Sequence, residues 1–168
     1  MYLTGLLSIM ILMSNYHQKK LMANVVLGID PGKHCGAAFF KEKKLVVLET
    51  YDVFGIMDVI KKLDEKDLVV IEDSRLQSVS FNDKSSDNKR VAFVKGRSVG
   101  GVDMICALIE SVCLDYQIPM IKLSPKSKGA KLDSESFKKH TGWTEKSNQN
   151  ERDAAMVAWT YRRGVKES

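Results

Sequence analysis

The sequence is poor in cysteine and proline and lacks a long apolar run. Its 168 residues include three cysteines and three prolines. Cys35, Cys106 and Cys113 are too few and too irregularly spaced for a disulfide framework or a zinc site, so we expect reduced thiols and a cytoplasmic protein. The apolar run of residues 6–13 is far too short to cross a bilayer and follows no basic segment, which predicts no membrane anchor.

Several well-defined nucleotide and hydrolase motifs are also missing. The sequence has no Walker A loop, no G-x-G-x-x-G fingerprint and no G-x-S-x-G elbow, so we expect no nucleotide cofactor. The actin-like ATPases begin with a strand similar to residues 28–32, which keeps ATP binding as an alternative. That fold needs two domains around the nucleotide, whereas 168 residues suit one domain.

The composition is that of a basic globular domain. Hydrophobic residues make up 44% and charged residues 28% of the chain, and the net charge is +5. A basic domain is compatible with a polyanionic partner. We expect residues 1–23 to be an N-terminal extension, either a short partner-binding helix or an upstream part of the reading frame, and residues 24–168 to be one domain.

Apolar periodicity predicts an α/β fold with the element order β-β-β-α-β-α-β-α-α. The first three strands are expected to form an antiparallel meander with a hairpin turn at residues 42–43, and the other two to run parallel, giving a mixed five-stranded sheet flanked by helices. Residues 73–98 are predicted to be a polar link, with a helix starting after Gly100-Gly101. The expected strands are 24–30, 36–41, 44–50, 68–72 and 118–123, and the expected helices are 53–63, 102–116, 134–140 and 148–163.

Three acidic residues stand at the ends of these predicted elements. Asp30 ends the first strand, Glu72 ends the fourth, and Asp153 lies in the first turns of the last helix. Taken singly, each fits a turn, a cap or a helix dipole. Together, carboxylates at strand ends point into the crevice where α/β folds bind ligands, and their mutual repulsion is relieved by divalent cations. The three therefore favour a metal site.

The sequences GIDPG (28–32), VIE (70–72) and DAA (153–155), in this element order, resemble the RuvC family of Holliday-junction resolvases, which has the RNase H-like fold. The compact size suggests a phage-type version. The resemblance implies a homodimeric endonuclease that uses two magnesium ions, with manganese able to substitute, and nicks one strand of a four-way DNA junction per protomer. It assigns catalysis and metal binding to Asp30, Glu72 and Asp153.

The chain departs from the family pattern at one position. The family places a fourth ligand, an acid or a histidine, three residues before the helix aspartate, and Asn150 stands there. Its amide oxygen is on the same helix face and can assist a metal, but it brings no charge. Glu151 has capping-box spacing from Asn148 and is assigned to the helix cap. Asp73 should face away from Glu72 and is assigned to a loop or cap.

Two basic stretches flank the acidic residues and predict a DNA-binding surface. Two other substrate classes stay open: flaps or forks, and RNA–DNA hybrids, cut by a related RNase H-like nuclease. A non-catalytic junction-binding protein is a further alternative. The residues expected to contact DNA are Lys33, Phe81, Lys84, Lys89, Arg90, Lys95, Arg97, Lys126, Lys128 and Lys131.

Overall fold

The computed structural model describes residues 24–77, 89–127 and 129–163, which are built around a mixed five-stranded sheet. The strand order is β3-β2-β1-β4-β5; β1, β2 and β3 are antiparallel, and β4 and β5 run parallel to β1. This arrangement confirms the predicted α/β class and the mixed five-stranded sheet, with three antiparallel strands followed by parallel ones. The elements are β1 (Val25–Asp30), β2 (Cys35–Lys41), β3 (Lys44–Tyr51), α2 (Val53–Ile60), β4 (Leu68–Glu72), the 3-10 turn η1 (Ser74–Leu76), α3 (Lys89–Asp115), β5 (Met120–Leu123), the 3-10 turn η2 (Pro125–Ser127), α4 (Ser134–Thr141) and α5 (Gln149–Ala158).

The hairpin between β2 and β3 is closed by a two-residue turn. Glu42 and Lys43 both have positive φ, at 50° and 71°, and Lys41 pairs with Lys44 across the turn. Two successive positive φ values are the signature of the type I′ turn, whose twist matches that of the flanking strands. The predicted hairpin is confirmed, although neither residue is the glycine or asparagine that usually occupies these positions.

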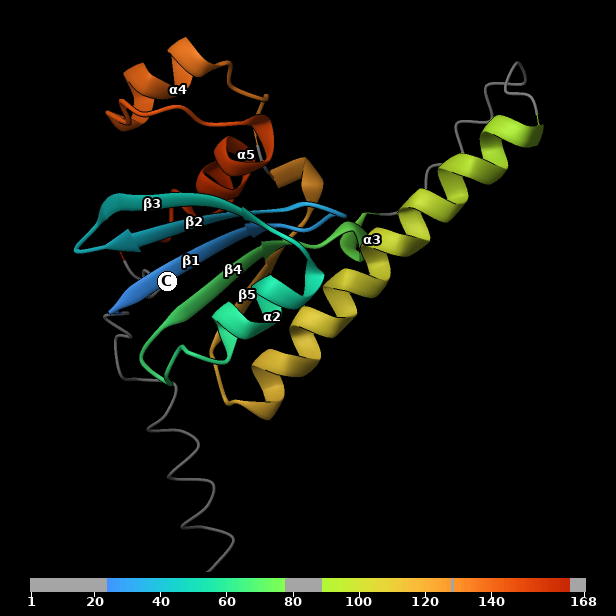
Figure 1. Ribbon diagram of the computed structural model, residues 1–168, viewed down its shortest axis with the longest axis horizontal. Helices are drawn as coiled ribbons and strands as arrows, with labels where there is room; N and C mark the ends of the chain where they lie inside the picture. The colour runs from blue at the N-terminus through green and yellow to red at the C-terminus, as the bar shows by residue number, and fades with distance from the viewer. Residues whose placement is uncertain (1–23, 78–88, 128, 164–168) are drawn as a thin grey trace, which may run out of the picture.

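Helices cover both faces of the sheet, and each face has its own core (Figure 1). On one face, Leu27 and Ile29 of β1 pack with residues of α2 and α3, including Ile109. On the other, Val26 of β1 packs with residues of α5, including Ala154. Because side chains alternate along a strand, this division fixes the face on which every later residue of β1 and β4 points.

Helix α3 begins at Lys89, so the predicted polar link over residues 73–98 was wrong from residue 89 onward, and the prediction that the helix starts after the glycines was wrong. Residues 78–88 of that link lie outside the described residues. Gly96, Gly100 and Gly101 lie inside the helix, and a Cβ at any of them would meet no atom within 4 Å. A helical glycine costs about 1 kcal/mol relative to alanine but does not break the helix. The N-terminal half of α3 projects beyond the sheet (Figure 1), so it lacks the apolar anchors that would have shown its periodicity.

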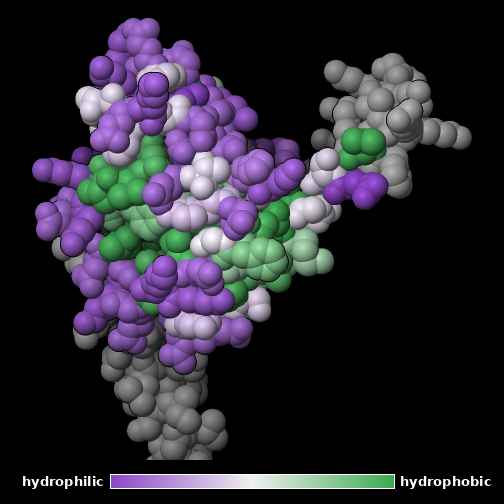
Figure 2. Space-filling model, in the orientation of Figure 1, coloured by the Kyte–Doolittle hydropathy of each residue, from purple (hydrophilic) through white to green (hydrophobic). Residues whose placement is uncertain are grey.

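The C-terminal half of α3 packs on the sheet as predicted, with one exception. Cys106, Ile109 and Cys113 are buried, whereas Tyr116, expected on the same apolar face, is 49% exposed. Tyr116 follows the last helical residue, and Gln117 turns the chain with a φ of 57°. Figure 2 shows apolar surface in the middle of the face on view, next to the base of the projecting helix. Met104 and Leu108 of α3 are exposed.

Several ends differ from the predicted ones. Helix α2 stops at Ile60, β5 starts at Met120, and α5 stops at Ala158. The expected N-terminal extension, residues 1–23, lies outside the described residues. None of the described helices is long and apolar enough to cross a membrane.

Candidate active site

Asp30 and Glu72 lie side by side at the ends of adjacent parallel strands. The last paired residues of β1 and β4 are Ile29 and Ile71, and the two acids follow them directly. Both acids continue the alternation of Val26 and Val70, so they point to the sheet face that α5 covers. Neighbouring strands are about 4.8 Å apart. The structure therefore brings together two of the three predicted acids.

Two glycines allow α5 to lie directly on the sheet beside these acids. A Cβ at Gly28 would come within 2.3 Å of the Ala154 carbonyl oxygen, and one at Gly36 within 2.0 Å of the Asn150 carbonyl oxygen. Any larger residue at either position would push the helix away. The close approach places Asp153 of α5 over β1, on the same side of the sheet as Asp30.

Asp153 is buried, and the structure gives partners to both of its carboxylate oxygens. Its Oδ1 accepts a hydrogen bond of 2.7 Å from Gln149 Nε2. Its Oδ2 lies 3.5 Å from Lys131 Nζ, in a pair where the lysine side chain is 71% exposed and the aspartate side chain 3%. A buried carboxylate needs such donors and charges to offset its lost hydration. Lys131, predicted to contact DNA, therefore also contacts a predicted catalytic acid.

Arg152 orients Gln149 and fixes the segment that carries Lys131. Its Nη2 donates to Gln149 Oε1 at 3.0 Å, which leaves the amide nitrogen of Gln149 directed at Asp153. Its Nε donates to the carbonyl oxygen of Leu132 at 3.1 Å. Neither role was predicted from the sequence. The i, i+4 spacing of Gln149 and Asp153 was a usable signal, whereas nothing local connects residue 152 with residue 132.

Asn150 connects α5 to the link between β1 and β2. Its Nδ2 donates a hydrogen bond of 3.2 Å to the carbonyl oxygen of His34. Asn150 is one helical turn before Asp153, on the same face, as predicted. Its predicted role as a metal ligand stays a prediction; the contact that the structure gives holds residues 31–34 against the helix.

The N-terminus of α5 is capped as predicted. The Asn148 side chain accepts from the Glu151 N–H at 3.0 Å, and the Glu151 side chain accepts from the Asn148 N–H at 2.8 Å. Thr50 of β3 adds a hydrogen bond of 3.0 Å to Glu151. Glu151 is thus held toward β3 by the cap, which confirms its assignment.

Asp73 lies on the opposite side of the sheet from Glu72, again as predicted. Its side chain caps η1 and accepts hydrogen bonds of 2.8 and 2.6 Å from the Arg75 guanidinium. Hydrogen bonding from Arg75 holds the pKa of this carboxyl below its usual value, against the effect of burial. Arg75 also pairs with Glu110 of α3 at 2.6 Å. This charge group fixes α3 to the end of β4 and belongs to the scaffold.

The acids suit magnesium in donor type but do not form a ready cluster. Carboxylate oxygens are the ligands that magnesium prefers. Within the three described ranges, however, no group of three His, Cys, Asp or Glu side chains converges closely enough to hold an ion. Lys131 lies against one oxygen of Asp153. A shared ion would therefore require side-chain rotations, with Lys131 displaced.

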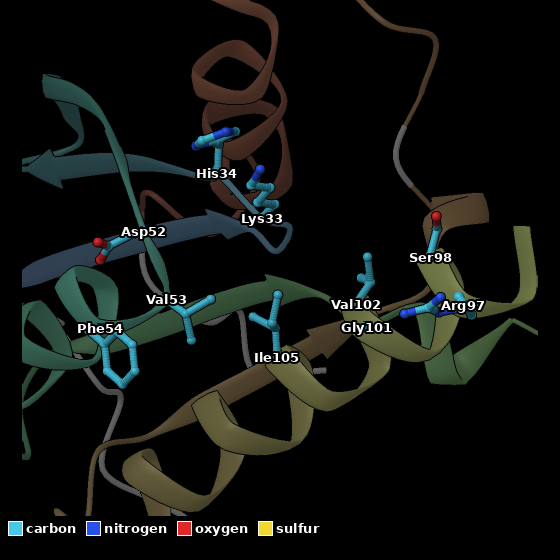
Figure 3. A pocket seen from close by; sticks show the side chains of 10 residues that line it. All are labelled: Lys33, His34, Asp52, Val53, Phe54, Arg97, Ser98, Gly101, Val102 and Ile105. Carbon is cyan, nitrogen blue, oxygen red and sulfur yellow. The ribbon is translucent and has the colours of Figure 1, made fainter. Parts of the chain in front are cut away.

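The nine predicted DNA-contacting residues other than Lys131 fall into four groups. Lys33 and Arg97 are exposed and line a cavity of about 650 Å³ between the β1–β2 link, α2 and α3 (Figure 3). Lys126 is exposed on η2. Lys89, Arg90 and Lys95 belong to α3, but their side chains are not described, and Phe81, Lys84 and Lys128 lie outside the described residues.

A second, smaller cavity of about 340 Å³ lies on the α5 side of the sheet. Glu72 lines it together with residues of α5, including Met156, and of the segment after β5, including Ser124. One of the predicted catalytic acids therefore lines a cavity on this face.

The chain is similar to solved structures, but it matches neither family models nor curated proteins. Among solved structures, "T. thermophilus RuvC in complex with Holliday junction substrate" is similar, with 19% sequence identity, a TM-score of 0.49, and coverage of 82% of this chain and 91% of that chain.

Proposed function

We propose that this protein is a magnesium-dependent endodeoxyribonuclease that resolves Holliday junctions. One observation carries the proposal: Asp30 and Glu72 end adjacent parallel strands on the face covered by α5, and α5 carries the buried Asp153. Carboxylates so placed repel one another unless a cation separates them. Hydrolysis would leave a 5′-phosphate and a 3′-hydroxyl.

The three acids would hold the metal, and the amide oxygen of Asn150 would assist. Two magnesium ions, or manganese in their place, supply an activated water and stabilise the leaving oxygen when bound. Gln149 and Arg152 keep one oxygen of Asp153 oriented through the hydrogen bonds described above. Lys131 would have to leave the other oxygen for an ion to share it, and its exposed side chain would then be placed to contact a DNA phosphate.

Homodimerisation would let two such sites act on one junction. The exposed apolar residues Met104 and Leu108, 61% and 43% exposed on α3, support this part of the proposal. They lie one helical turn apart and so share a face. A Leu108→Lys variant should shift the protein toward the monomer in light scattering, while the mass of the wild type should be that of two chains.

The test is cleavage of a synthetic four-way junction with magnesium. Wild type should cut it, Asp30→Asn and Asp153→Asn should bind without cutting, and Asp58→Asn, an exposed residue of α2, should behave as wild type. Equal cutting of linear duplex and junction contradicts junction resolution. Preferential cutting of flaps, forks or RNA–DNA hybrids identifies a related nuclease of another substrate class.

A non-catalytic junction-binding protein is the second candidate. It is favoured by the uncharged Asn150 at the fourth ligand position and by the pairing of Lys131 with Asp153. Under this alternative the acids bind no pair of ions, and wild type binds junctions but cuts nothing with magnesium or manganese.

A further inference from the structure

The larger cavity, beside α3, is lined by residues that have no role in the proposed metal site. It is lined from three segments: Lys33 and His34 of the β1–β2 link, residues 52–54 at the start of α2, and residues 97–105 of α3 (Figure 3). Its volume of about 650 Å³ is in the range of sites for small molecules and cofactors. It is on the sheet face opposite to the one toward which Asp30 points.

The floor of this cavity is apolar and its edge carries an exposed aromatic ring. Val53, Val102 and Ile105 line it and pack against the core behind them. Phe54 lines it too, yet 81% of its surface is exposed. A flat apolar ring at the edge of an apolar cavity is suited to stack on a planar ligand.

The edge of the cavity also carries charged side chains. Lys33 and Arg97 bring two positive charges, and His34 lies beside Lys33. The carboxylate of Asp52 caps the N-terminus of α2, where it accepts a 2.7 Å hydrogen bond from the Gly55 N–H. A ligand with a planar apolar part and a phosphate matches this distribution, whereas a second copy of the same cationic edge does not.

The cavity and the acids share the β1–β2 link. Residues 31–34 join Asp30 directly to β2, and the carbonyl oxygen of His34 accepts the hydrogen bond from Asn150. Lys33 and His34 line the cavity and belong to this link, so the cavity adjoins the segment that follows Asp30 (Figure 3).

We propose that this cavity binds one unstacked nucleotide next to the cleaved phosphate, with Phe54 stacking on its base and Lys33 and Arg97 contacting its phosphates. The inference rests on the proposed nuclease function and adds a subsite to it. Such a site favours branched or distorted DNA, because a nucleotide leaves the stack most readily where pairing is already interrupted.

The experiment compares Phe54→Ser, Phe54→Trp and Leu114→Ser in the full-length protein. Leu114 is 72% exposed on α3, nine residues beyond the cavity, and serves as the control. Loss of one stacked base should weaken binding to a four-way junction by about tenfold in Phe54→Ser, while Phe54→Trp and the control bind as wild type. Thermal unfolding should be unchanged, since the ring is exposed.

A scan of abasic positions locates the nucleotide. Wild type should lose affinity when one position beside the cleaved phosphate is abasic, and Phe54→Ser should be insensitive to the same change. If Phe54→Ser binds and cuts as wild type does, the subsite is wrong and the nuclease stands. If wild type cuts nothing but Phe54→Ser still loses affinity, the nuclease is wrong and a nucleotide site without a cleaved phosphate remains. If Phe54→Ser changes only the dimer mass, a second copy occupies the cavity and the inference is overturned.

Discussion

The ammonium group of Lys131 lies 3.5 Å from Oδ2 of Asp153, and this pair joins an exposed cation to a buried anion. Because the lysine is mostly in water, the pair contributes at most about 1 kcal/mol to stability. Its position matters more than its strength: the lysine supplies positive charge at the oxygen that a divalent ion would use. Lys131 and magnesium are therefore expected to compete for Asp153.

Replacing Lys131 by methionine should increase the response of the protein to magnesium. Without metal, Lys131→Met leaves the buried Asp153 with less compensation, so its melting temperature should fall below that of wild type. Added magnesium should then raise the melting temperature more in the variant than in wild type, since no ammonium has to be displaced. Thermal unfolding across a magnesium titration measures both effects. Lys139→Met, which removes an exposed lysine paired with Glu135 on α4, is the matched control. Equal magnesium responses in all three proteins would show that Lys131 and the ion do not compete.

Asn150→Asp tests whether the amide acts as a ligand or only as a tie to His34. The change removes the donor to the His34 carbonyl oxygen and places a negative charge beside it, so the metal-free variant should lose about 0.5–1.5 kcal/mol of unfolding free energy. With magnesium, the added carboxylate should recover that loss and strengthen metal binding, because ligand charge raises affinity. Urea unfolding with and without magnesium gives the comparison. Asn150→Ala removes the tie without adding charge and should not recover. If magnesium restores the unfolding free energy of neither variant, Asn150 is not a metal ligand.

The sheet and the pair of strand-end acids could be predicted because their signals are local. Each strand is a short apolar run bounded by turn residues, and the positions of Asp30 and Glu72 follow from where β1 and β4 end. The capping of α5 by Asn148 and Glu151 is equally local, three residues apart.

What could not be predicted depends on contacts between distant segments or on missing contacts. The pairing of Lys131 with Asp153 and the hold of Arg152 on Leu132 arise from the path of the chain after β5, for which no periodic pattern exists. The start of α3 was mistaken because its first residues pack on no sheet, so the helix carries no apolar stripe there and its glycines imitate a boundary.

Asp73→Asn should remove a part of the unfolding free energy that depends on pH. The pKa of Asp73 is lowered by hydrogen bonding from Arg75, so its stabilising effect is fully present above the unfolded-state pKa of about 3.9 and is lost as the pH falls through the lower folded-state value. At neutral pH the variant should be less stable by about 1.5–3 kcal/mol, the range for hydrogen bonds to charged groups. Urea unfolding between pH 7 and pH 2 should show the two proteins converging below pH 4. Asp58→Asn, which alters an exposed pair with Lys61, should stay close to wild type throughout. A gap for Asp73→Asn that persists at pH 2 would mean that its loss of stability does not come from the charge.

The close approach of α5 to the sheet predicts opposite effects for two glycine-to-alanine changes. In Gly36→Ala the new Cβ would come within 2.0 Å of the Asn150 carbonyl oxygen, so α5 must move and stability should fall by about 1–3 kcal/mol or more. In Gly101→Ala the Cβ meets nothing within 4 Å inside a helix, and stability should rise by about 0.5–1 kcal/mol. Urea unfolding measures both changes, and junction cleavage adds the functional readout. Gly36→Ala should lose cleavage under conditions where it is still folded, because Asp153 moves with the helix relative to Asp30 and Glu72. Cleavage at the wild-type rate by folded Gly36→Ala would show that the position of α5 over β1 and β2 does not govern the site.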